Sequence, residues 1–430
     1  MHPKEEKFLP IPDLPPALNV DLKKRYFIPD WDDRVDKEYD FLTDTATQNR
    51  NPFSDDKYAH EIYTTPNYDG ILVSKFVVDK SQKRKKYIET NGIHKSLRFS
   101  GEIMGDCGAF SYIDNDKPPY STTEILDYYE QLGFDYGVSI DHLIVGPYAE
   151  PGVRRKRYEL TLKNAEEFLQ KHSSGGYKFK PIGVAQGWNP ASYAKAVKKL
   201  INMGYEYVAL GGLARTPSKE IIEILCSTRP HLKSNTQMHL FGVGRINAIP
   251  AFHYLGVTSF DSASPLRSAW LDSKANYHTL SGVTYAAVRI PPVNKHGVRV
   301  KRVLAAGISN WEELKQLEQD SLKAMRDFGS GNLTVEETLS VLLAYDKFLE
   351  LPVDGKVKPE AQARRLRQHA QMYRKLLEDK PWESCGCPIC KKIGVEVVIF
   401  RGNDRNRRRG FHNTYIFHKR FNALLKDRKS

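Results

Sequence analysis

Short apolar runs alternate with amphipathic segments between residues 70 and 270 of the chain. Each run has the length of a buried strand, and a segment with apolar residues at helical spacing follows most of them. Ser121 and Glu124 have the spacing of a capping box, which predicts a helix start. These units predict a parallel α/β fold, and they fit a TIM (β/α)8 barrel better than an open sheet. The predicted strands span residues 71–78, 102–106, 136–141, 181–186, 207–212, 238–244 and 257–261.

Three of the five cysteines lie within six positions, in the run Cys385-Gly386-Cys387-Pro388-Ile389-Cys390. Such crowding is more typical of a metal site than of disulfides or of isolated buried or redox-active thiols. His412 completes a Cys3His set, and His418 is the alternative fourth ligand. Four protein ligands leave no position for water, so the set predicts a structural Zn²⁺ that joins this segment to the barrel.

The remaining segments complete the predicted organisation. Residues 395–400 are expected to form the eighth strand, with a last helix over 413–425. Alternation around residues 294–297 predicts a hairpin, and residues 309–380 have the pattern of charged helices. We therefore expect an irregular N-terminal arm (1–67), barrel units one to seven (68–279), a hairpin and helical insertion (280–380), and a zinc-binding segment with the last barrel unit (381–430).

The net charge of the chain indicates the class of partner that it binds. Its 430 residues carry a formal net charge of +13, which favours a polyanion such as nucleic acid. Arg154-Arg155-Lys156-Arg157 follows the predicted third strand, and a second run contains Arg405 and Arg407–Arg409. Both runs are candidates for phosphate contacts, although such runs are often only solvated. The chain has no apolar stretch long enough for a membrane span and no secretory h-region at Met1–Lys7, so we expect a cytoplasmic protein without a membrane partner.

Polar residues end several of the predicted strands. In a parallel barrel these positions share one functional face, although any single Asp there can instead cap the next helix. Two carboxylates on such a face suit nucleophilic displacement at an acetal-like carbon, where one attacks and the other handles protons. A glycine pair permits close backbone approach to a flat ligand, and Asp and Gln side chains can pair with a purine edge. The residues are Asp106, Asp141, Gln186, Gly211-Gly212 and Asp261.

These positions stand in motifs that resemble those of the tRNA-guanine transglycosylases, zinc-containing barrel enzymes that exchange guanine for a 7-deazaguanine base. The resemblance covers residues 70–270 and 383–425. The motifs are Asp106-Cys107-Gly108-Ala109-Phe110-Ser111, Ser139-Ile140-Asp141, Gly183-Val184-Ala185-Gln186-Gly187, Leu210-Gly211-Gly212-Leu213-Ala214, Leu240-Phe241-Gly242-Val243-Gly244, Phe260-Asp261, and the set Cys385, Cys387, Cys390 and His412.

The resemblance implies a role for each matching residue. Asp261 corresponds to the nucleophile and Asp106 to the general acid and base. The base is expected to contact Asp141, Gln186 and the Gly212–Leu213 backbone. Arg267 corresponds to an arginine that holds the nucleic acid, and Arg154, Arg155, Lys156 and Arg157 are further candidates for that contact.

Two departures bear on the substrate. Trp270 stands where the tRNA enzymes have a second arginine, and His142-Leu143 replaces Glu-Cys after Asp141. Trp270 points away from tRNA, and the Asp106–Ser111 motif together with the insertion before the cysteines resembles the branch that places a 7-deazaguanine such as preQ0 into DNA. We therefore expect guanine exchange in DNA, with a DNA-modification system as the source of possible partner proteins. The alternatives are exchange in tRNA, a non-catalytic nucleic-acid-binding barrel, and a glycoside hydrolase that uses the same carboxylates.

Overall fold

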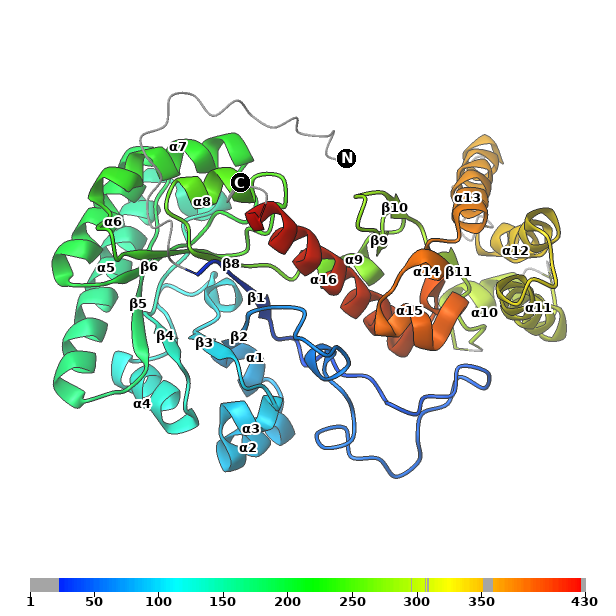
Figure 1. Cartoon of the computed structure of the whole chain (residues 1–430), viewed down its shortest axis with the longest axis horizontal. Helices are drawn as coiled ribbons and strands as arrows, with labels where there is room; N and C mark the ends of the chain where they lie inside the picture. Colours follow the sequence, from blue (N-terminus) through cyan, green and yellow to red (C-terminus); the bar gives the residue numbers. More distant parts are fainter. Residues whose placement is uncertain (1–22, 295, 306, 308, 351–358, 427–430) are drawn as a thin grey trace. The chain divides into compact units, whose positions relative to one another are not determined.

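The computed structural model describes residues 23–294, 296–305, 307, 309–350 and 359–426. Eight parallel strands close into a barrel in which β8 pairs with β1 (Figure 1). The predicted TIM-like barrel is therefore confirmed. Its strands are β1 (Arg25–Pro29), β2 (Gly70–Ser74), β3 (Glu102–Asp106), β4 (Tyr136–Val138), β5 (Lys180–Ala185), β6 (Tyr207–Leu210), β7 (Gln237–Leu240) and β8 (Ser259–Asp261).

The first and last strands differ from the prediction. Strand β1 lies in the segment expected to be an irregular arm, and it pairs with β2 and β8. The prediction that residues 395–400 form the eighth strand is wrong. Gly394–Val398 is a 3-10 helix, and the two-residue strand β12 (Ile399–Phe400) pairs outside the barrel with β11 (Val288–Arg289). Val395, Val397, Val398 and Ile399 are buried, so burial rather than strand formation accounts for the apolar pattern.

Contacts divide the chain into two compact units. Of the described residues, unit 1 comprises 23–32, 68–263 and 420–426, and unit 2 comprises those within 33–67 and 264–419. Within the described part of unit 1, amphipathic helices cover the barrel, and Ser121 caps α4 as predicted by accepting the backbone N–H of Glu124. These helices are α1 (Lys75–Asp79), α2 (Gln82–Asn91), α3 (Ile93–Leu97), α4 (Thr122–Leu132), α5 (Pro151–Gly175), α6 (Pro190–Met203), α7 (Ser218–Thr228) and α8 (Ile249–Tyr254).

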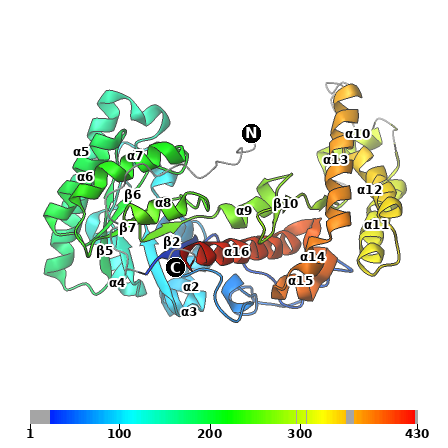
Figure 2. The same cartoon turned by 45° about the horizontal axis from the view of Figure 1, so that its top comes forward.

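Unit 2 is mostly helical, as expected for residues 309–380. Helix α12 packs between α11 and α13, which Figure 2 shows side by side. Its other elements include the short antiparallel pair β9 (Tyr277–His278) and β10 (Thr284–Tyr285). The helices are α9 (Ser264–Leu271), α10 (Val298–Ala305), α11 (Trp311–Gly329), α12 (Val335–Leu349), α13 (Pro359–Asp379), α14 (Pro381–Ser384), α15 (Pro388–Ile393) and α16 (Gly402–Lys426), the last of which continues into unit 1.

The hairpin predicted around residues 294–297 is wrong, because the chain forms helix α10 from Val298 onward. Val298 and Val300 fit a strand-like alternation, whereas Val300 and Val303 have a helical spacing. Val300 and Val303 are buried while Val298 is 63% exposed, which is the helical solution. Helix α16 likewise begins at Gly402, so His412 lies inside it rather than at its start. No helix among the described residues has the length and apolarity needed to cross a bilayer.

Polar contacts of the buried Arg25 side chain join the N-terminal ends of several barrel strands. Arg25 at the start of β1 is 5% exposed and donates to Glu102 Oε2 at 2.7 Å and to the Tyr136 hydroxyl at 2.6 Å. It also hydrogen-bonds Gln237 at the start of β7. The guanidinium therefore links β1 to the three strands β3, β4 and β7.

We expect Arg25→Ala to destabilise the protein, because it leaves the carboxylate of Glu102 and the amide of Gln237 without their buried donor. The expected loss in the free energy of unfolding is about 2–4 kcal/mol, measured by urea denaturation. Arg155→Ala is the control, since the Arg155 side chain is 80% exposed, and it should stay within about 0.5 kcal/mol of wild type. Equal stability of the two variants would contradict a structural role for Arg25.

Candidate active site and metal centre

The predicted strand-end residues gather at the C-terminal end of the barrel in unit 1. Asp106 and Asp261 are the last residues of β3 and β8. Asp141 lies in the loop after β4, and Gln186 comes directly after β5. Asp141 and Gln186 touch, because Gln186 Nε2 donates to Asp141 Oδ2 at 2.6 Å. The barrel thus brings three carboxylates and an amide from four strands to one face.

These carboxylates have unusual electrostatics. Burial raises the pKa of Asp106 to about 7, and the negative charges of Asp141 and Asp261 act in the same direction. A hydrogen bond from the Gly108 N–H, 2.9 Å from Asp106 Oδ2, only partly opposes this rise in pKa. Burial also raises the pKa of Asp141 to about 6, against the lowering effect of the Gln186 hydrogen bond. A carboxyl group that titrates near neutral pH is suited to both donate and accept a proton.

The carboxylate of Asp261 has other hydrogen-bond partners than those of Asp106 and Asp141. Its side chain is buried, and Oδ1 accepts hydrogen bonds from the Gly242 N–H at 2.9 Å and from His239 Nε2 at 3.1 Å. Within the described part of the chain, no hydrogen bond reaches Oδ2. One oxygen of this carboxylate is therefore anchored and the other is available for chemistry.

Gln186 and the glycine pair form a tightly packed surface. Gln186 is 1% exposed, and its Oε1 has no hydrogen-bond partner among the described residues. A Cβ at Gly211 would lie 2.2 Å from Gln186 Nε2, and Gly212 has a φ of +80°. The Tyr193 hydroxyl donates to the Gly211 carbonyl at 2.8 Å. A side chain at Gly211 would therefore displace Gln186, the backbone of Gly212 favours glycine, and a buried acceptor is left for a ligand.

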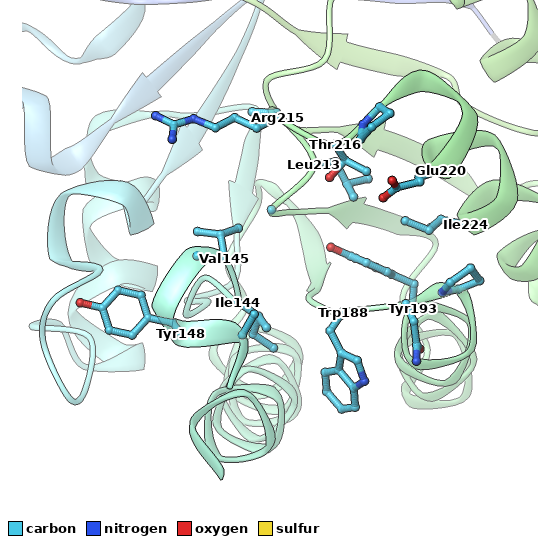
Figure 3. A pocket seen from close by; sticks show the side chains of 18 of the residues that line it. Ile144, Val145, Tyr148, Trp188, Tyr193, Leu213, Arg215, Thr216, Glu220 and Ile224 are labelled. Atoms are coloured by element: carbon cyan, nitrogen blue, oxygen red, sulfur yellow. The ribbon is translucent and has the colours of Figure 1, made fainter. Parts of the chain in front are cut away.

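A cavity of about 930 Å³ adjoins this surface. The loop Gly212–Leu213 lines it, together with aromatic and aliphatic side chains. Figure 3 shows side chains of the segment after β4 on one side and those of helix α6 and the loop after β6 on the other. The labelled lining includes Ile144, Val145, Tyr148, Trp188, Tyr193, Leu213, Arg215, Thr216, Glu220 and Ile224.

Unit 2 brings together the four predicted metal ligands. The ligand atoms of Cys385, Cys387, Cys390 and His412 all lie within 4.8 Å of one another. His412 Nδ1 is 3.6, 3.4 and 3.4 Å from the three sulfurs, in chain order. A tetrahedral zinc with Zn–S of about 2.3 Å and Zn–N of about 2.1 Å separates sulfur and nitrogen by about 3.6 Å, so the set fits this ion.

The surroundings of His412 favour metal binding. His412 Nε2 donates to the carbonyl of His278 at 2.8 Å, which leaves the lone pair of Nδ1 facing the sulfurs. The ring of Tyr277 stacks on the imidazole at a centroid distance of 4.2 Å. The Cys390 N–H also donates to Cys387 Sγ at 3.3 Å. This cluster can therefore hold a metal, with His412 rather than His418 as its imidazole ligand.

The residues of the basic runs differ in their exposure and in their contacts. Arg155 and Lys156 are exposed on the first turns of α5, and Arg154 lies over the ring of Trp188 at 4.7 Å. Arg157 is instead buried and donates to the carbonyls of Leu143 and Ile113. Arg267 is exposed on α9 of unit 2.

Three of the four arginines of the run in α16 contradict the expectation of phosphate contacts. Arg405 pairs with Asp44 and Glu396, and Arg409 is 0% exposed and donates to backbone carbonyls. Arg408 is also buried, against Asp404. These guanidinium groups stabilise the interior of unit 2 and are not a binding surface.

Two contributors to the site did not emerge from the sequence. The backbone N–H of Gly242 carries no side-chain signal. His239 is a polar residue inside an apolar strand, and a fully buried histidine in a strand is the signal that could have found it.

Comparisons with known proteins agree with this geometry. A family model described as TGT, queuine tRNA-ribosyltransferase, matches residues 58–278. A DNA-guanine transglycosylase of Salmonella montevideo is 38% identical over 423 residues, which are 94% of this chain and 98% of that protein. tRNA-guanine(15) transglycosylases of Methanocaldococcus jannaschii and Methanococcus vannielii are 26% and 27% identical over 46% of this chain, and cover 30% and 31% of those proteins.

The chain belongs to the queuine tRNA-ribosyltransferase (TGT) family, and it is a transglycosylase of the pentosyltransferase type. The family predicted from the motifs is confirmed. Among the relatives above, the DNA-guanine transglycosylase matches nearly the whole chain, whereas each tRNA enzyme matches less than half of it.

Proposed function

We propose that this chain replaces guanine in DNA with a 7-deazaguanine base such as preQ0, through a covalent aspartyl-deoxyribose intermediate. The observation that carries the proposal is the pair Asp106 and Asp261 on one barrel face. Asp106 has a pKa of about 7, and Asp261 has one anchored and one available oxygen. The near full-length similarity to a DNA-guanine transglycosylase supports DNA as the polymer.

The first half of the reaction releases guanine. Asp261 Oδ2 attacks C1′ of the target nucleotide from the face opposite the base, and the C1′–N9 bond breaks. The electron pair of that bond goes to guanine, and the protonated carboxyl of Asp106 supplies the proton that neutralises it. The deoxyribose is then held as an ester of Asp261.

The second half reverses the roles. The carboxylate of Asp106 takes the N9 proton of the incoming base, and N9 attacks C1′. The C1′–Oδ2 bond breaks, and its electron pair returns to the carboxylate of Asp261. Two displacements give net retention at C1′. The exchange itself needs no redox cofactor or nucleotide triphosphate, because each bond broken is replaced by one formed.

Recognition of the base is assigned to Asp141, Gln186 and the backbone of Gly212 and Leu213. The unpaired Oε1 of Gln186 accepts an N–H of the base, and Asp141 accepts another. The target nucleotide must leave the base stack to reach this surface. The adjoining cavity of about 930 Å³ is larger than one base needs, so it also has room for the neighbouring nucleotide.

The polymer and the metal complete the proposal. Arg154, Arg155 and Lys156 contact phosphates, and Arg267 is a further contact. Arg157 is excluded from this role by its buried hydrogen bonds. The proposed structural Zn²⁺ would be held by Cys385, Cys387, Cys390 and His412. Its role would be to fix α14 and α15 against α16 within unit 2.

We expect guanine release to fall as the pH rises above about 7, since the first half requires protonated Asp106. Asp106→Asn should slow release by about 100- to 10 000-fold and remove this pH dependence. Because the pKa of Asp106 is raised in the folded protein, its ionised carboxylate destabilises the fold at any pH above the pKa of the unfolded chain. Asp106→Asn should therefore be more stable than wild type above pH 7, and this gain should disappear near pH 4. Single-turnover guanine release and thermal melting at several pH values measure these effects.

The test of the function is guanine release from duplex DNA, single-stranded DNA and tRNA, each with and without added preQ0. We expect release of guanine only from DNA, matched by uptake of one preQ0 for each guanine lost. Release from tRNA alone would show that the substrate is tRNA rather than DNA. Absence of release from every polymer, by a folded and metal-loaded protein, would support a non-catalytic binding protein.

A further inference from the structure

We propose that His239 is a positioning residue for Asp261: it holds Oδ1, so that Oδ2 is the oxygen that bonds to C1′. This inference rests on the proposed function and adds a residue that the motifs do not contain. His239 lies on β7 directly opposite Ser259 of β8, with its side chain 0% exposed. Its Nε2 is 3.1 Å from Asp261 Oδ1, the same oxygen that accepts the Gly242 N–H at 2.9 Å.

A chain of buried hydrogen bonds fixes the imidazole behind this contact. His239 Nδ1 is 2.8 Å from Ser259 Oγ, and Ser259 Oγ is 2.5 Å from the Tyr207 hydroxyl. A carboxylate only accepts hydrogen bonds, so Nε2 carries the proton that faces Asp261. In the tautomer with its only ring proton on Nε2, Nδ1 accepts from the Ser259 hydroxyl, which in turn accepts from Tyr207. In that tautomer every member of the chain has a hydrogen-bond partner.

Packing restricts the ring itself. The His239 imidazole meets the ring of Phe27 edge-on at 5.9 Å and the ring of Phe241 at 4.7 Å. Burial raises the pKa of Tyr207, so its hydroxyl stays protonated and keeps donating. The imidazole therefore cannot turn to offer Nδ1 to Asp261 without breaking two buried hydrogen bonds.

The arrangement has a consequence for both halves of the reaction. When Oδ2 bonds to C1′, Oδ1 becomes the carbonyl oxygen of the ester and keeps its two donors. When N9 of the new base attacks, the C1′–Oδ2 bond breaks and the carboxylate leaves with the electron pair. Donors at Oδ1 stabilise the charge that develops in this second step. His239 thus sets which oxygen attacks and assists its departure, without touching the substrate.

His239→Phe tests the contact, because it keeps a ring of similar size and removes the donor. We expect kcat for exchange to fall on the order of 100-fold, with KM for DNA and for preQ0 within about twofold of wild type. His239→Gln, whose amide can donate from a similar position, should restore kcat to within about tenfold of wild type. The control is His253→Phe, a buried histidine of α8 bonded to the Val257 carbonyl, which should retain wild-type kcat.

Ser259→Ala keeps the imidazole and removes the hydroxyl that orients it, so it should lower kcat by about three- to tenfold with KM unchanged. It also tests the proposal if His239→Phe fails to fold. Folded His239→Phe with kcat within about threefold of wild type would overturn the proposal, as would equal losses in the Phe and Gln variants. Wild-type protein without any exchange would instead refute the proposed function itself.

Discussion

Replacing Asp261 with asparagine is expected to abolish the covalent enzyme–DNA adduct and to reduce base exchange by about 10 000-fold or more. The reason is chemical: Asn presents an amide oxygen with little nucleophilicity, and it cannot form the ester. The Gly242 N–H can still donate to the side-chain oxygen, so the fold of the site should persist. The adduct is scored on a denaturing gel with labelled DNA under single-turnover conditions.

Asp116→Asn is the matched control, since it makes the same chemical change at an exposed position of unit 1. Its adduct and its exchange rate should equal those of wild type. Binding of DNA by Asp261→Asn should also be preserved, because the carboxylate acts on C1′ and not on the phosphates. A covalent adduct that survives in Asp261→Asn would assign the nucleophile to another residue.

Loss of the metal is the second large expected effect. We expect one zinc ion per chain in freshly purified protein, and Cys387→Ser should remove it and lower the free energy of unfolding by more than about 4 kcal/mol. In this variant two cysteines and one imidazole of the cluster remain crowded together without the ion that would join them. Elemental analysis and thermal melting, each repeated with a chelator, measure the two effects.

Cys226→Ser provides the comparison, because Cys226 is an exposed cysteine of α7 in unit 1, outside the cluster. This variant should keep both its zinc and its melting temperature. Wild-type protein that contains no metal, or Cys387→Ser that keeps a full equivalent of it, would contradict the assignment of the site.

The strand-end residues could be predicted from the sequence because a parallel barrel places them by rule. Once Asp106, Asp141, Gln186 and Asp261 are each assigned to the end of a strand, the topology brings them to one face. The metal ligands could be predicted for a similar reason, since Cys385, Cys387 and Cys390 stand too close together for separate roles. In both cases local spacing carries the long-range information.

The parts that could not be predicted depend on contacts far along the chain. Strand β1 contains only Tyr26, Phe27 and Ile28 as an apolar run, and it becomes a strand through pairing with β2 and β8. The arginines of α16 look like a basic surface in sequence, but their carboxylate partners Asp44 and Glu396 come from other segments. His239 is likewise assigned only by its distance to Asp261.

The central claim is exchange of guanine in DNA, and it is tested most directly by the identity of the nucleoside that acquires a new base. The protein is incubated with isotope-labelled preQ0 and an equimolar mixture of DNA and tRNA, and both polymers are digested to nucleosides for mass spectrometry. The account predicts labelled preQ0 deoxyribonucleoside, with loss of an equal amount of deoxyguanosine. Label found only in a ribonucleoside, or in neither polymer, would contradict it.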